Sequence, residues 1–375
     1  MSKDNKKNAV TLNNLKSFTN SSSMDSIKSA ILAAVLGLIC GFIVMLLANP
    51  AQAGMGLYSL LVGGLRRIPD VFYYSTPIMM TGLAVGFAYK MGMFNIGASG
   101  QFTMGMYWAM YVGFMVDLPP ILHCLAAVIA GTIGGMAWGF IPGFFKAYFN
   151  VNEVITSIMF NYIGMYFVDM WVQSSAVMYV SSKTRTAYLP ASVQLPSLGI
   201  TGSSVSVAII IAILLAVALY IILYKTTFGY ELRATGFNKH GAEYAGMNGK
   251  KNIILTMVIA GGLAGMGGAF AILAPSTIIG SSMTYEPINI IAGEGFDGIA
   301  VALLGASNPI GIVFSALFIS LLKCGGTLAS LYGFKPEIVD VVVAIIIYFS
   351  AFAMFMNVML KNKFSKLGKK KDKEV

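Results

Sequence analysis

The chain has 375 residues, of which 57% are hydrophobic and only 11% are charged. Soluble domains carry about 25% charged residues, so this composition excludes an ordinary globular protein and predicts an integral helical membrane protein. The net charge of +10 lies mainly in both tails and in the segment 225–252. Such clusters are typical of the cytoplasmic flanks of membrane helices. We therefore expect contact with membrane lipid and none with nucleic acid.

Ten apolar runs follow one another along the chain, and the shortest of them are expected to be broken or re-entrant helices. They cover about 29–48, 71–89, 102–116, 121–141, 154–172, 204–224, 253–273, 291–304, 309–323 and 337–360. The predicted fold class is therefore all-α, with a transmembrane domain over 29–360. A polar tail, 1–28, precedes this domain, and a basic tail, 361–375, follows it.

Ten crossings place both tails on the same side of the membrane. The positive-inside rule assigns that side to the cytoplasm. The same alternation places 225–252 inside and the loops 173–203 and 274–290 outside. The segment from Pro142 to Glu153 is expected to connect two spans, and Pro119 with Pro120 is expected to form a tight turn.

The segment 225–252, here called the basic loop, has a helical pattern from Asn238 to Met247. Asn238 is the expected N-cap, and Gly246 or Gly249 the expected end of that helix. A short capped helix in the cytosol predicts a surface that another protein binds.

Polar groups interrupt the apolar runs at 94–101, where Asn95 and Gln101 flank three glycine or alanine residues. One interpretation is a broken helix beside a water-filled path, and the other is an interfacial turn. Asn161 either lines such a path or bonds across helices. Glu153 begins a span, where a carboxylate suits the helix dipole.

Glu294 and Asp297 lie three residues apart at the entry to the run 291–304. Carboxylates within a membrane point to function. They are interpreted as gate or pathway residues, or alternatively as a proton relay. The two histidines, His123 and His240, have no acidic cluster beside them, so no metal site is expected.

No phosphate-binding loop, metal-binding helix motif or catalytic constellation is found in the sequence. We therefore expect no enzymatic activity and no cofactor in this chain. If the protein moves a solute against a gradient, the energy comes from an ion gradient or from a partner ATPase. The basic loop favours the partner.

Four motifs in order carry a resemblance: FNIGASGQ (94–101), FNVNEVITSIMFNYI (149–163), GYELRATGFNKHGAEYAGMN (229–248) and FDGIAVALLGASNPIG (296–311). Together they resemble the permease subunits of bacterial ABC importers for nucleosides and simple sugars, and most closely the guanosine and purine nucleoside branch. The family usually has Glu where this chain has Ser99. The resemblance covers about residues 60–350.

The resemblance implies a permease in the bacterial cytoplasmic membrane that transports nucleosides. Its implied partners are a second homologous permease, an extracellular solute-binding lipoprotein, and a cytosolic ABC ATPase that holds ATP and Mg. The implied coupling helix contains Asn238, His240, Ala242, Glu243, Tyr244, Ala245 and Gly246. The expected substrate pathway contains Phe94, Asn95, Gln101, Asn161, Phe296, Asp297 and Asn308. Alternatives are the same role for ribose or galactose, or an ion-coupled transporter that uses Glu294 and Asp297.

Overall fold

The computed structural model describes residues 34–200, 203–278, 280–335, 337–346 and 348–349. The predicted tails, the start of the run 29–48 and the end of the run 337–360 lie outside the described residues. The chain divides into two units, 1–57 with 329–375, and 58–328.

The first unit contains an apolar helix, Ala34–Ala48, and a helix over 337–346. A Cβ at Gly37 would overlap Ile346, and one at Gly41 would overlap Val342. These two helices therefore pack at close range through small residues. The short helices α2 (Ala53–Tyr58) and η4 (Ser330–Tyr332) lie where the chain leaves and re-enters this unit.

The second unit is almost entirely helical. Its elements in chain order are η1 (Ser59–Gly63), α3 (Gly64–Arg66), α4 (Ile68–Lys90), α5 (Ala98–Met115), α6 (Pro120–Phe149), α7 (Glu153–Ser174), β1 (Tyr179–Val180), η2 (Ser181–Lys183), β2 (Arg185–Thr186), η3 (Ala191–Val193), α8 (Ala208–Lys225), α9 (Thr227–Phe237), α10 (Lys239–Tyr244), α11 (Gly249–Ile272), α12 (Gly293–Leu304) and α13 (Pro309–Ala329). The antiparallel pair β1–β2 aligns Tyr179 with Thr186, and it is the small exception to the all-α prediction in the described part.

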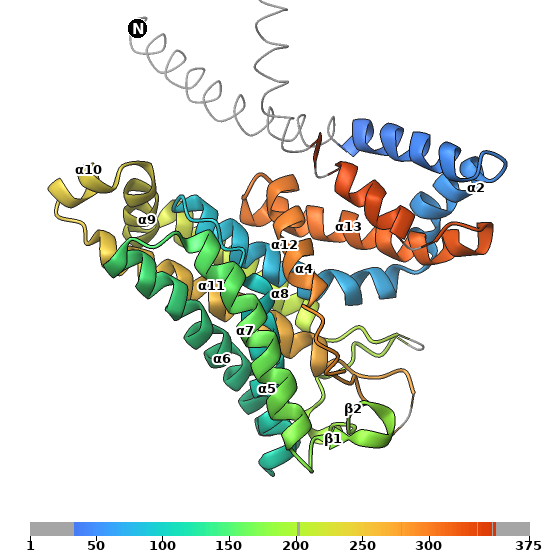
Figure 1. The fold of residues 1–375 in the computed structure, drawn as a ribbon, viewed down its shortest axis with the longest axis horizontal. Coiled ribbons are helices and arrows are strands. Elements are labelled where there is room, and N and C mark those ends of the chain that lie inside the picture. Colours follow the sequence, from blue (N-terminus) through green and yellow to red (C-terminus); the bar gives the residue numbers. More distant parts are fainter. Residues whose placement is uncertain (1–33, 201–202, 279, 336, 347, 350–375) are drawn as a thin grey trace, which may run out of the picture. The chain divides into compact units, whose positions relative to one another are not determined.

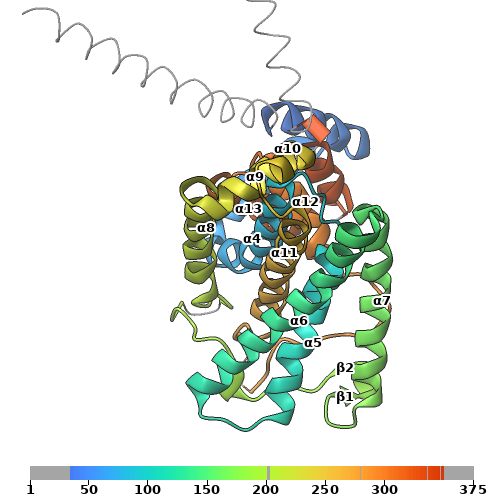
Figure 2. The ribbon, with the colours of Figure 1, turned by 90° about the vertical axis from the view of Figure 1, so that its left-hand side faces the viewer.

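Five helices in the described residues are long and apolar enough to cross a membrane: Ile68–Lys90, Pro120–Phe149, Ala208–Lys225, Gly249–Ile272 and Pro309–Tyr332. The membrane-protein class follows, whereas the number of ten spans stays a prediction. Within the second unit, α9 and α10 lie at one end and the β1–β2 hairpin at the other, as both views show (Figures 1 and 2).

The centre of this unit is the contact between α6 and α11. A Cβ at Gly135 would overlap the carbonyl oxygen of Gly261, and a Cβ at Gly139 would overlap that of Met257. The two backbones touch because no side chain separates them. In a membrane, where apolar side chains gain little from leaving lipid, such backbone contact supplies much of the packing energy.

Two segments between apolar runs are helical in the structure. The segment after residue 141 is not a connector, because α6 runs through the buried Pro142 to Phe149. Neighbouring helices make a proline tolerable inside a membrane helix. The polar segment after the first run forms α2, η1 and α3, since Leu60 and Gly64 pack against the carboxyl-terminal half of α13.

Candidate functional site

The first group of predicted site residues gathers at the start of α5. Gly97 occupies the N-cap position and has no side chain with which to cap the helix. Asn161 of α7 performs this task from another helix, because its Oδ1 accepts the Gly100 N–H at 2.8 Å. Its Nδ2 donates to the Ile96 carbonyl oxygen at 2.9 Å. Asn161 thus bonds across helices, as one of its two predicted roles required.

The side-chain amides of Asn95 and Gln101 form two hydrogen bonds with each other. Asn95 Nδ2 donates to Gln101 Oε1 at 2.9 Å, and Gln101 Nε2 donates to Asn95 Oδ1 at 3.2 Å. Both side chains are buried. In this conformation the amide cluster of Asn95, Gln101 and Asn161 fixes the irregular segment 91–97 against α5 and α7.

The beginning of α12 packs directly on the start of α5 and on α4. A Cβ at Gly295 would overlap Ser99, and one at Gly298 would overlap Thr81. The Thr81 hydroxyl also donates to the Glu294 carbonyl oxygen at 2.7 Å. A glutamate side chain in place of Ser99 would meet the start of α12, so this departure from the family motif matches a close helix contact.

A cavity of about 320 Å³ lies between α4, α11, α12 and α13. Small-molecule sites span roughly 300–1,000 Å³, so the cavity is large enough for a solute. Its lining residues are Arg67, Tyr73, Tyr74, Pro77, Ile78, Ala271, Glu294, Asp297, Ser320, Lys323, Cys324 and Thr327.

Asp297 faces this cavity from α12 and pairs with Lys323 of α13. The Lys323 Nζ lies 2.5 Å from Asp297 Oδ2, and the two side chains are 33% and 23% exposed. Arg67, another lining residue, pairs with Asp70 at 2.6 Å. The ion pairs lower the cost of placing charges in an apolar domain.

The other predicted pathway residues are dispersed. Phe296 is 46% exposed on the outer side of α12, and Phe94 is half-buried in the 91–97 segment. Asn308 caps α13, because its Oδ1 accepts the Ile310 N–H at 3.0 Å. None of these three residues lines the cavity.

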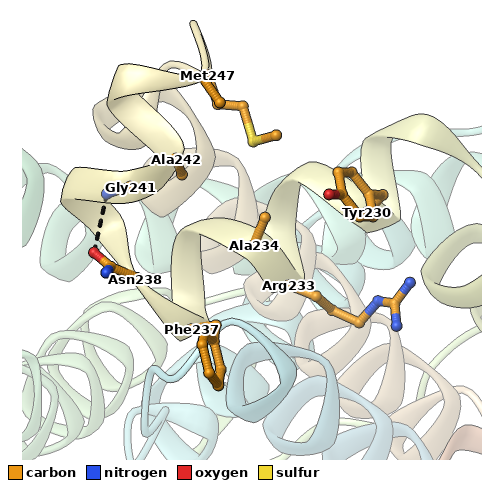
Figure 3. Close-up of a pocket in the computed structure, with 9 residues that line it drawn as sticks. Tyr230, Arg233, Ala234, Phe237, Asn238, Gly241, Ala242 and Met247 are labelled. Atoms are coloured by element: carbon orange, nitrogen blue, oxygen red, sulfur yellow. Dashed lines mark hydrogen bonds between the residues drawn. The ribbon is translucent and has the colours of Figure 1, made fainter.

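The basic loop folds into α9 and α10. Asn238 caps α10 as predicted, with its Oδ1 accepting the Gly241 N–H at 2.9 Å (Figure 3). At the other end Gly246 has a φ of 84°. Its N–H bonds to the Glu243 oxygen, and the Met247 N–H bonds to the Ala242 oxygen, each at 3.0 Å. This pattern is a Schellman termination, which favours glycine at Gly246.

A groove of about 410 Å³ separates α9 from α10. Its lining is Tyr230, Arg233, Ala234, Phe237, Asn238, Gly241, Ala242, Ala245 and Met247, most of which Figure 3 labels. Phe237 is 96% and Tyr244 95% exposed. His240 and Glu243 share the outer side of α10, with 3.8 Å between their nearest charged atoms. Large exposed aromatics on a capped helix present a ready contact surface.

The basic loop is fixed to the helical core. The Asn252 side chain of α11 donates to the Thr235 hydroxyl of α9 at 2.9 Å. A Cβ at Gly236 would overlap the backbone of Met91. Met91 also accepts a hydrogen bond on its sulfur from Thr256 at 3.0 Å. The helix α9 therefore contacts both α11 and the segment that leads into the amide cluster.

Asp169 of α7 binds the loop 274–292 at the opposite end of the unit, and the sequence interpretation overlooked it. Its carboxylate accepts the Tyr285 hydroxyl at 2.6 Å and the Asn289 N–H at 2.8 Å. Burial, this hydrogen bond and the charge of Asp169 raise the pKa of Tyr285 above its ordinary value. Thr186 and Tyr285 also exchange two hydrogen bonds, which tie the hairpin to the loop 274–292.

Lys323 was overlooked in the same way. Both Asp169 and Lys323 stand inside or beside an apolar run, and an ionisable residue there is a functional candidate by default. That rule was applied only to Glu294 and Asp297. Across the part of the chain that the structure describes, no group of three or more His, Cys, Asp or Glu side chains is placed to hold a metal ion.

Comparison with known proteins decides the family. Residues 67–351 match the sequence model of a protein family described as the permease component of the branched-chain amino acid transport system. The chain belongs to this permease family. No solved structure matches it.

Curated relatives of this permease extend the match over most of the chain. The guanosine ABC transporter permease protein NupP of Bacillus subtilis is 38% identical over 86% of the chain and 92% of its own length. The nucleoside ABC transporter permease protein NupB of Lactococcus lactis is 35% identical over 88% and 92%, respectively. The resemblance found in the four sequence motifs is thereby confirmed, and the protein is a multi-pass membrane protein of the permease type.

Proposed function

We propose that this permease forms the membrane path of an ATP-driven importer for nucleosides. One observation carries the proposal: two relatives named for guanosine or nucleoside transport match over 92% of their lengths at 38% and 35% identity. A neutral nucleoside also suits a path that is lined by amides, tyrosines and paired charges and that carries no large excess of either charge.

The proposed transporter contains a second permease. Bacillus subtilis and Lactococcus lactis each have another relative named for the same substrate, the guanosine permease NupQ and the nucleoside permease NupC, at 25% and 24% identity. Since this chain is nearer to NupP and NupB, we propose that it is one half of a core made of two different permeases. An ABC ATPase, which holds ATP and Mg, and an extracellular solute-binding lipoprotein complete the assembly.

The basic loop is the proposed contact with the ATPase. Both chain ends and this loop then lie in the cytoplasm, with the β1–β2 hairpin outside. Closure of the ATPase moves α10, whose proposed contact residues are Asn238, His240, Ala242, Glu243, Tyr244, Ala245 and Gly246. The contacts of α9 with Met91 and Asn252 pass this motion to the core.

The proposed solute path follows α12. Asp297 lines this path. Phe296 lies beside it on α12, and Asn308 lies just beyond the carboxyl end of α12. Phe94 and the amide cluster of Asn95, Gln101 and Asn161 support its wall in the present conformation and open when α5 moves.

A test uses cells that lack other nucleoside uptake and express the complete transporter. Labelled guanosine should accumulate, unlabelled uridine or guanosine should compete, and ribose and galactose should not. Uptake should fail on ATP depletion and persist with a protonophore. Competition by sugars alone, or uptake that only the protonophore stops, would overturn the proposal.

The proposed ATPase contact has its own test. The variant Glu243→Ala with Tyr244→Ala should lose import while the permease keeps its abundance in the membrane. Lys251→Ala, an exposed change in the same loop outside the groove, is the control. Equal import by both variants would remove α10 from the mechanism.

A sugar is the second candidate, because the glucose ABC transporter permease protein TsgB13 of Haloferax volcanii is 25% identical over 75% of the chain. The competition experiment separates the two solutes directly.

A further inference from the structure

The cavity between α4, α11, α12 and α13 contains a polar group that the protein itself leaves unused. The Ser320 side chain is 0% exposed, and its hydroxyl has no hydrogen-bond partner among the described residues. Ser320 lines the cavity. A buried hydroxyl without a partner is energetically costly, so a ligand group that reaches it gains an available hydrogen bond.

The ion pair lies beside this serine on the same helix. Ser320 and Lys323 are three residues apart on α13 and therefore share a face. Lys323 holds Asp297 from α12. A carboxylate accepts hydrogen bonds through both oxygens, whereas an ammonium and a serine hydroxyl donate them. This set matches a pair of alcohol groups, each of which is both a donor and an acceptor.

The charges of the lining favour a neutral ligand. Each basic side chain of the lining already has an acidic partner, because Arg67 pairs with Asp70 and Lys323 pairs with Asp297. Their formal charges cancel, so a phosphate or another net anion meets no unpaired cation. The ligand is thus an uncharged molecule with several hydroxyl groups.

Two aromatic rings form another part of the wall. Tyr73 and Tyr74 of α4 lie with their ring centroids 4.9 Å apart and their planes inclined by 63°. Aromatic faces take up flat heterocycles by stacking at little conformational cost. A nucleobase is a flat heterocycle of this kind.

We propose that this cavity is a transit site for the nucleoside, in which Asp297, Lys323 and Ser320 bind the ribose hydroxyls and the two tyrosines contact the base. The proposal rests on nucleoside import as the proposed function. It assigns recognition to the sugar edge that all ribonucleosides share, so purine and pyrimidine nucleosides both fit.

The test removes one hydroxyl from the protein and, separately, two hydroxyls from the solute. Complete transporters containing wild-type permease or Ser320→Ala are placed in proteoliposomes with the same ATPase and binding protein. Initial import rates are measured for guanosine and for 2′,3′-dideoxyguanosine. Because the other subunits are identical, any difference between the two preparations arises in this chain.

Ser320→Ala should lower kcat/KM for guanosine about tenfold, the value of one hydrogen bond of some 1.4 kcal/mol. It should leave the value for 2′,3′-dideoxyguanosine unchanged, since that solute lacks the 2′ and 3′ hydroxyls that would bond to Ser320. A merely structural role would lower both equally.

Ser157→Ala is the matched control. Ser157 is also 0% exposed and its hydroxyl also has no partner, but it belongs to α7 and does not line the cavity. It should import both solutes as the wild type does.

Three results would overturn the assignment. Equal effects of Ser320→Ala on both solutes would reduce the serine to packing, and no effect on either would remove it from the path. Wild-type import of a sugar or leucine instead of guanosine would reject the proposed function itself. The first two results leave nucleoside import intact and reject only the ribose site.

Discussion

Replacing Asn161 with alanine tests whether one side chain from α7 caps α5. The substitution leaves two backbone groups without partners, the Gly100 N–H and the Ile96 carbonyl. Gly100 is buried and Ile96 is half-buried. With about 1–3 kcal/mol for a buried unsatisfied group and less for a half-buried one, the expected loss of folding free energy is about 2–4 kcal/mol.

The assay is thermal unfolding of the purified permease in mild detergent, followed by tryptophan fluorescence. The control is Asn248→Ala, which removes a cap of the same chemistry from α11, where Asn248 Oδ1 accepts the Lys251 N–H at 3.0 Å. Asn248 is exposed, so water replaces the lost bond and the cost is about 1 kcal/mol or less. Asn161→Ala should therefore melt at the lower temperature of the two. Equal melting temperatures would refute the assignment of Asn161 as the cap of α5.

Two further predictions concern the ends of the second unit. Tyr285→Phe removes the donor to Asp169 and should cost about 1–3 kcal/mol at neutral pH. Because the pKa of Tyr285 is raised in the folded state, its contribution is complete below the ordinary value of about 10 and declines as the pH rises further. The free energy of unfolding should thus fall less steeply with rising alkaline pH in the variant than in the wild type. Equal slopes for the two proteins would contradict this. Gly236→Ala places a Cβ on the backbone of Met91 and should impair import and stability together. Gly54→Ala, where a Cβ meets nothing within 4 Å, should change neither, and equal losses in the two alanine variants would speak against a specific contact at α9.

Local features of the fold were predictable from the sequence. The apolar runs located most of the long helices, because hydrophobic composition over about 20 residues is a strong signal. The caps of α10 were also predictable, since Asn238 and Gly246 act on neighbouring backbone atoms. The helix α9 was missed because its residues are mixed in polarity, and its position depends on contacts with Met91 and Asn252.

The candidate site was only half predictable for the same reason. Asp297 was found because a carboxylate in an apolar run stands out, but its partner Lys323 is 26 residues away and meets it only after α12 and α13 pack. The pairing of Asn161 with Gly100 spans 61 residues. No spacing rule connects such positions, so residue types alone identified the participants but not their partners.

The glycine contact between α6 and α11 has a mechanical consequence. Two backbones that touch directly have no layer of side chains that can repack, so the pair transmits displacement with little loss. The helix α11 begins just after residues 245–248, which join it to α10. Its 24 residues span about 36 Å. A displacement of α10 should therefore be transmitted along α6 and α11 as one rigid pair, and deformation should concentrate where packing is irregular, at residues 91–97.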